Sequence, residues 1–167
     1  MPSLESVGLG NEILRNMTLE EIKNLGTHLV SRAFSLVEAP LLKKRLDPFC
    51  VPGFQAEQSC ALSCILYLNS LGTTQCTAWQ GPYNPWCQTR RSGSAGGSIA
   101  GAPVSSSISS ASSWCSHVAL GASWVTNNPA CFQGDNDCGS SFTCVGGVAA
   151  AYGNGDLLVK VYGGAWS

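Results

Sequence analysis

The chain has 167 residues, of which 11% are charged, and its formal net charge at pH 7 is -1. Nucleic acids and anionic membranes are bound through clustered Lys and Arg, so this low charge density excludes a nucleic-acid partner. No apolar run reaches the roughly 18 to 20 residues that a membrane-spanning helix needs.

Residues 1–45 have the pattern of a charged helical leader. Thr18 followed by Glu21 matches a capping box, in which both side chains accept hydrogen bonds from free backbone N–H groups at a helix start. Apolar residues then recur at three- and four-residue steps and define one amphipathic face. This face consists of Ile22, Leu25, Leu29, Ala33, Leu36 and Val37. Pro40 ends the helix. The alternative is an ordinary first helix that packs on the rest of the domain.

The run Lys43-Lys44-Arg45 has the form of a processing site for a Kex2-type or furin-type protease. Cleavage after Arg45 divides the chain into a helical pro-segment, residues 1–45, and a disulfide-rich mature domain, residues 46–167. A second basic pair, Arg90-Arg91, precedes the small-residue run 92–98, which we expect to be a flexible, exposed linker. A cut at that pair nicks the mature domain into two chains. The alternative is a solvated loop that carries two arginines.

The mature domain is expected to contain two helices and about four short strands. Residues 55–71 place Cys60, Cys64 and Leu68 on one helical stripe, and Gly72 suits the end of that helix. A strand follows at 73–79 and a turn-rich loop at 80–85. The steps from Ile108 to Val125 predict the second helix, which Asn127-Asn128-Pro129 ends.

Strand candidates after the second helix are 130–132, 141–145 and 157–162, and the turn residues 153–156 predict a hairpin between the last two. These elements predict an α+β fold. It is a small, disulfide-rich two-layer sandwich, with two helices on a roughly four-stranded antiparallel sheet, preceded by the helical pro-segment.

Nine cysteines at this density indicate a disulfide framework formed in an oxidising compartment. They are Cys50, Cys60, Cys64, Cys76, Cys87, Cys115, Cys131, Cys138 and Cys144. We therefore expect a secreted, extracellular protein whose signal peptide has been removed. There is no Cys-x2-Cys pair, and the histidines are His28 and His117, so neither structural zinc nor another cofactor is expected.

Cysteine parity leaves one of the nine over. Five cysteines precede Arg90-Arg91 and four follow it. One bridge between these segments leaves the odd thiol in the second, and no bridge leaves it in the first. The connectivity itself stays open.

Few residues are candidates for acid–base chemistry. His117 lies one helical turn from Ser113, and only the fold can bring it to Glu57, Asp135 or Asp137. We interpret His117 as a structural residue, and Asp135-Asn136-Asp137 as a polar turn, because the full calcium-loop pattern is missing. No catalytic residues are predicted.

This organisation resembles the fungal killer toxins and the related small secreted effectors of plant-associated fungi. The shared features are the pro-segment, dibasic cleavage at Lys44-Arg45, a second pair at Arg90-Arg91, and two disulfide-stapled pieces that each contribute a helix. The resemblance implies toxicity or virulence through binding a membrane or a host protein, without catalysis. Defensin-like proteins share the Cys60-x3-Cys64 spacing, but their Cys-x-Cys partner is missing here.

Two other classes stay open. In a ribosomally synthesised, bacteriocin-like precursor, residues 1–45 are a leader that a maturation enzyme reads, and Ser, Thr and Cys are its substrates. In a surface-active or self-assembling structural protein, exposed tryptophans drive association. The chain has five tryptophans, which in so small a domain are expected mostly in the core: Trp79, Trp86, Trp114, Trp124 and Trp166.

Overall fold

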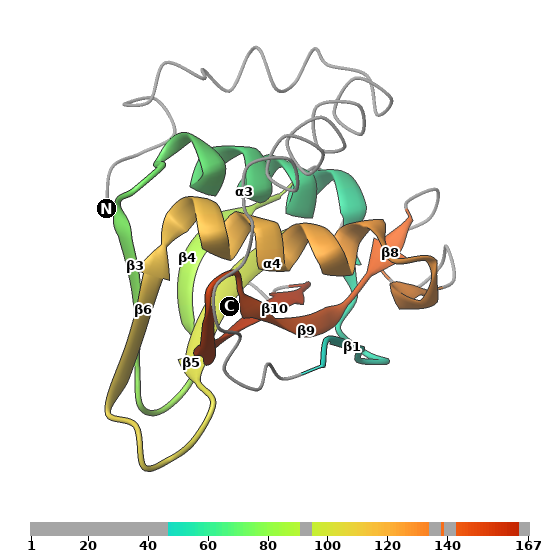
Figure 1. Ribbon diagram of the computed structural model, residues 1–167. Coiled ribbons are helices and arrows are strands. Elements are labelled where there is room, and N and C mark those ends of the chain that lie inside the picture. The colour runs from blue at the N-terminus through green and yellow to red at the C-terminus, as the bar shows by residue number, and fades with distance from the viewer. Residues whose placement is uncertain (1–46, 91–94, 134–137, 139–142, 164–167) are drawn as a thin grey trace.

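The computed structural model describes residues 47–90, 95–133, 138 and 143–163 (Figure 1). Within these residues, the α-helices α3 (Gln58–Ser70) and α4 (Cys115–Asn127) lie side by side over one face of an antiparallel sheet. The sheet has five strands in the order β1-β9-β10-β5-β4. Their bounds are β1 Phe49–Cys50, β4 Asn84–Thr89, β5 Gly97–Pro103, β9 Gly147–Ala151 and β10 Asn154–Tyr162. Helix α3 contacts β4 and β5, and α4 contacts β9 and β10.

Two smaller sheets complete the described fold. Strands β2 (Ala56–Glu57), β8 (Cys144–Val145) and β7 (Phe132–Gln133) pair in that order, and the 3-10 helix η2 (Pro129–Cys131) leads into β7. Strands β3 (Gln75–Trp79) and β6 (Ser110–Trp114) form a two-stranded ribbon. In Figure 1 this ribbon starts at one end of the helical layer, and its loops reach beyond the five-stranded sheet.

The expected sandwich of two helices on about four strands is wrong, because the described residues form ten strands in three sheets. Four of these strands, β1, β2, β7 and β8, have only two residues each and show no alternation in the sequence. Strands β5 and β9 are rich in Gly and Ala and are buried along most of their length, so their apolar and polar residues do not alternate either. The expected helical pro-segment lies outside the described residues.

The second helix begins later than the sequence predicts. Ile108 and Ala111 precede α4, and Ala111 belongs to strand β6. The steps from Ala111 to Cys115 fit a helix, but residues 110–114 also alternate between outward and buried positions, as a strand requires. Serine favours helix interiors weakly, and β3 supplies a partner strand, so the strand forms instead.

The sequence predicts that residues 97 and 98 belong to a flexible linker. This expectation is wrong, because both residues lie buried in β5. Gly97 stands where α3 crosses this strand, and a Cβ at this position would lie 2.6 Å from the backbone N of Ala61. Gly121 of α4 meets β9 in the same way, since its Cβ would lie 2.7 Å from the carbonyl oxygen of Ala150. The small residues therefore let both helices pack closely on the sheet.

The core lies between the helical layer and the five-stranded sheet. Its largest fully buried aliphatic side chains come from both helices and from three strands: Leu62, Ile65, Leu68, Val118, Val125, Ile99, Val145, Leu157, Val159 and Val161. At the end of β9, Gly153 has a φ of 75° in the turn that leads into β10. The predicted hairpin is therefore present, but its first strand is β9 rather than residues 141–145.

Four disulfides staple the described fold, which confirms the expected cysteine-rich, disulfide-bonded domain. The pairs are Cys50–Cys131, Cys64–Cys87, Cys76–Cys115 and Cys138–Cys144. Two of them join the segments before and after Arg90-Arg91, so both expected bridge counts, one and zero, are wrong. Cys60, which is buried, takes part in none of the four.

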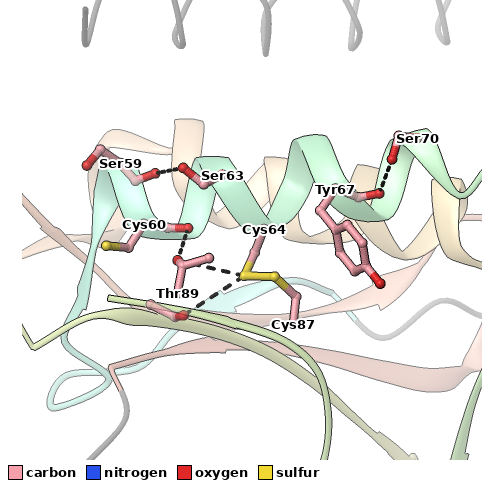
Figure 2. Close-up of a disulfide and its surroundings, with 9 residues drawn as sticks. Ser59, Cys60, Ser63, Cys64, Tyr67, Ser70, Cys87 and Thr89 are labelled. Atoms are coloured by element: carbon pink, nitrogen blue, oxygen red, sulfur yellow. Dashed lines mark hydrogen bonds between the residues drawn. A yellow bond between two sulfur atoms is a disulfide. The ribbon is translucent and has the colours of Figure 1, made fainter. Parts of the chain in front are cut away.

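Figure 2 shows how the Cys64–Cys87 disulfide fixes α3 to β4. Beside it, the hydroxyl of Thr89 donates a hydrogen bond to the carbonyl oxygen of Cys60 at 2.8 Å. Ser63 and Ser70 donate to carbonyl oxygens of their own helix. The sulfur bridge and the hydroxyl bond therefore hold the last residues of β4 against α3.

Candidate functional site

The β3–β6 ribbon has one buried and one exposed face. The strands pair antiparallel from Gln75 opposite Trp114 to Trp79 opposite Ser110. Side chains of successive strand residues point to opposite sides, and the alternate positions Cys76, Ala78, Ala111 and Ser113 are buried. The other six positions are exposed or half-buried and form what we call the outer face: Gln75, Thr77, Trp79, Ser110, Ser112 and Trp114.

Two tryptophans mark the opposite ends of the outer face. The exposed fraction is 61% for Trp79 and 44% for Trp114. Their positions in the register differ by four residues, which corresponds to about 13 Å along the ribbon. Thr77 and Ser112 lie directly opposite each other between them. All six residues of the outer face are uncharged.

The backbone beneath this face is fixed at several points. The Cys76–Cys115 disulfide ties β3 to the first residue of α4, and the N–H of Cys115 donates to the carbonyl oxygen of Thr74 at 2.8 Å. The buried indole of Trp86 donates from Nε1 to the carbonyl oxygen of Thr77 at 3.0 Å. The outer face therefore stands on a rigid support.

The ring of Trp114 packs against a second aromatic group. Its centroid lies 4.9 Å from that of His117 on α4, and His117 lies 5.5 Å from the ring of Tyr152. The N–H of Tyr152 donates to the carbonyl oxygen of His117 at 3.1 Å. Burial lowers the pKa of His117, and its backbone contact with Tyr152 opposes this shift. The ring of His117, which also packs on Tyr152, therefore orients the indole of Trp114.

A family model described as a domain of unknown function (DUF8794) matches residues 47–163, which is the greater part of the chain. The chain belongs to the DUF8794 family. The comparisons with curated proteins and with solved structures found no significant match.

The DUF8794 domain has a second aromatic cluster, which surrounds Lys160 of β10. The Nζ of Lys160 lies 3.8 Å from the ring centroid of Phe54 and 4.6 Å from those of Tyr83 and Tyr162. Burial lowers the pKa of Lys160 and raises that of Tyr83. Because the ammonium group already contacts three ring faces, we interpret this cluster as a structural clamp that holds two loops to β10.

The acid–base candidates of the DUF8794 domain have structural partners. Glu57 is 3% exposed, and its carboxylate caps α3 by accepting from the N–H groups of Ser59 and Cys60, each at 3.1 Å. Both residues that donate to Glu57 lie in the first turn of α3, so this carboxylate has a structural role. His117 contacts Trp114 and Tyr152, as described above, and Asp135 and Asp137 lie outside the described residues.

The predicted processing residues fall partly on the described chain. Arg90 is exposed directly after β4, whereas Lys43, Lys44, Arg45 and Arg91 lie outside the described residues. Among the residues that the structure describes, no group of three or more His, Cys, Asp or Glu is placed to hold a metal ion. In the same part of the chain, no helix has the length and apolar character to cross a membrane.

The exposure of Trp79 and Trp114 is not among the expectations drawn from the sequence. Tryptophan is usually buried in small domains, and this general tendency argues against predicting an exposed face that contains two tryptophans. A usable signal was present for Trp79, because Cys76 and Ala78 alternate with Thr77 and Trp79 in a predicted strand. Burying the small residues of this strand directs its tryptophan outward.

Proposed function

We propose that this protein is a secreted toxin or virulence effector that acts by binding a target on another cell, without catalysis. The observation that supports this best is the outer face of the β3–β6 ribbon, where Trp79 and Trp114 stand exposed on a disulfide-anchored support. Rigid, exposed aromatic side chains are typical anchors of binding surfaces. The four disulfides fit an extracellular protein.

The contacts of the acid–base candidates favour binding over hydrolysis. A glycosidase needs two carboxyl groups across a substrate, whereas the carboxylate of Glu57 is buried at the start of α3. A triad base needs a carboxylate that orients it, whereas the ring of His117 packs between Trp114 and Tyr152.

The proposal includes removal of residues 1–45 by a Kex2-type or furin-type protease. The family match begins at residue 47, close after Arg45, and Arg90 is exposed as a processing site must be. Incubation with a Kex2-type protease is expected to cut after Arg45. A folded protein that resists at this position refutes the processing step and leaves the binding step to its own test.

Binding to cells tests the function directly. The oxidised protein, labelled with a fluorophore, is added to fungal cells and to plant tissue, and bound label and growth or tissue response are measured. We expect binding that is lost when Trp79→Ala and Trp114→Ala are combined. Trp124→Ala is the matched control, because Trp124 is 39% exposed but lies on α4. Absence of binding to every cell type, or equal loss in the control, contradicts the proposal.

A further inference from the structure

We infer that the outer face of the β3–β6 ribbon binds a neutral polysaccharide, lying along the ribbon from Trp79 to Trp114. This inference rests on the proposed function and names the class of its target. Pyranose rings present flat C–H faces that stack on exposed indole rings, and their hydroxyl groups hydrogen-bond to hydroxyl and amide side chains. The outer face combines both chemistries, with indoles at its ends, Thr77 and Ser112 between them, and Gln75 directly opposite Trp114.

The absence of charged side chains among the six residues of the outer face favours a neutral ligand. None of the six outer-face residues carries a charge. The ammonium group of Lys160 contacts the rings of its own cluster on β10. A sulfated glycan, a nucleic acid or an anionic lipid needs clustered cations, and the outer face supplies none.

The geometry favours the interior of a long chain over a single sugar. The tryptophans stand about 13 Å apart along the ribbon, so one ligand that contacts both must span several sugar rings. A two-stranded ribbon is open at both ends, and a polysaccharide can therefore pass across it without a free chain end.

Part of the surface is already ordered before a ligand arrives. Trp114 packs on His117, and Ser112 accepts a hydrogen bond at its carbonyl oxygen from Nδ2 of Asn154 at 2.8 Å. The carbonyl of Thr77 is held by Trp86. Binding to such a surface loses little side-chain and backbone freedom.

The residues between the tryptophans distinguish this surface from a membrane-binding one. Membrane-binding surfaces combine a continuous apolar face with flanking Lys or Arg. On the outer face, by contrast, hydroxyl groups separate the two indoles and no basic residue is present.

Titration with soluble oligosaccharides tests the inference. The probes are oligomers of chitin, β-1,3-glucan, cellulose and mannan, with phosphatidylcholine and phosphatidylserine vesicles as the membrane probes, and binding is measured by calorimetry and tryptophan fluorescence. We expect at least one oligosaccharide to bind and neither vesicle to do so. Trp79→Ala and Trp114→Ala should each weaken the affinity about tenfold. Trp124→Ala should leave it unchanged, since position 124 lies about 14 Å further along α4 than Cys115.

Each other outcome overturns the inference. These outcomes are failure of all four oligosaccharides to bind, equal loss of affinity in the Trp124 variant, preferential binding to vesicles, or self-association in sedimentation that depends on Trp79 and Trp114.

The variants must retain four disulfides by mass and a native circular dichroism spectrum. Thr77→Val, which removes the hydroxyl group of a half-buried residue and keeps the side-chain shape, serves as a second variant that should weaken binding. If cell binding still requires the two tryptophans while every oligosaccharide fails, the ligand class is wrong and the proposed function stands. If cell binding also fails, both are wrong.

Discussion

The Cys76–Cys115 disulfide is expected to contribute more to stability than the Cys138–Cys144 disulfide, although all four cysteines are buried. A cross-link stabilises the native state mainly by reducing the entropy of the unfolded chain, and this effect grows with the length of the closed loop. The sequence separation is 39 residues for the first pair and 6 for the second. The chain-entropy relation then gives about 4 kcal/mol for Cys76–Cys115 and about 2 kcal/mol for Cys138–Cys144.

Paired substitutions isolate this difference. Replacing both partners of one bridge with Ala removes the cross-link and leaves a similar small cavity at either location, so the cavity cost largely cancels between the two double variants. Guanidinium chloride unfolding of the oxidised proteins gives the free energy of unfolding from the midpoint and the slope. The Cys76→Ala/Cys115→Ala protein should be the less stable of the two by about 2 kcal/mol.

Equal losses in the two double variants, or a larger loss for the short loop, refute the reasoning from loop length. The long-loop variant should also lose the affinity of the outer face for its target, because β3 is then no longer tied to α4. A variant that keeps full binding shows that hydrogen bonds alone hold the ribbon.

Three further changes have defined outcomes. Glu57→Ala removes the cap of α3 and should lower the free energy of unfolding by about 1–2 kcal/mol in guanidinium chloride, and a Glu57→Gln protein as unstable as the alanine variant contradicts the capping role. The pKa of His117 is lower in the folded protein than in the unfolded chain, so the unfolded chain binds more protons as the pH falls below about 6.5. The free energy of unfolding should therefore fall as the pH decreases through this range. Between pH 7.5 and 5.5 the urea midpoint of His117→Gln should fall less than that of the unchanged protein. An identical fall excludes His117 as the cause. Cleavage at Arg90-Arg91 should leave one band on a non-reducing gel and two after reduction, because two disulfides join the halves. Separation without reductant contradicts this pairing.

The helices show what periodicity can and cannot predict. The predicted helix over 55–71 is confirmed as α3, because Cys60, Cys64 and Leu68 repeat at helical steps and Gly72 follows its end. The predicted start of the second helix at Ile108 is wrong, because Ala111 and Cys115 are four residues apart and this spacing fits a helix as well as a strand followed by a helix. Only the pairing of β6 with β3, a contact between distant segments, decides between the two.

The strands and the candidate site were harder to predict for different physical reasons. Gly97 and Ser98 resemble a linker in sequence, yet they are buried because α3 requires small residues beneath it. The exposure of Trp114 depends on the direction of β6, which could not be predicted because the sequence pattern assigns the residues of this strand to the second helix. Disulfide pairs depend on distances across the fold, and parity alone cannot provide these.

The position of β10 has a consequence for how the domain acquires its disulfides. This strand follows all the others along the chain, yet it lies between β9 and β5 in the sheet. The sheet therefore cannot close until β10 has been synthesised, and by then all nine cysteines have been synthesised, because the last of them is Cys144. Early oxidation pairs whichever thiols are near one another, and exchange between disulfides takes seconds to hours without a catalyst. The rate of maturation should therefore be set by disulfide isomerisation rather than by the order in which the cysteines are made.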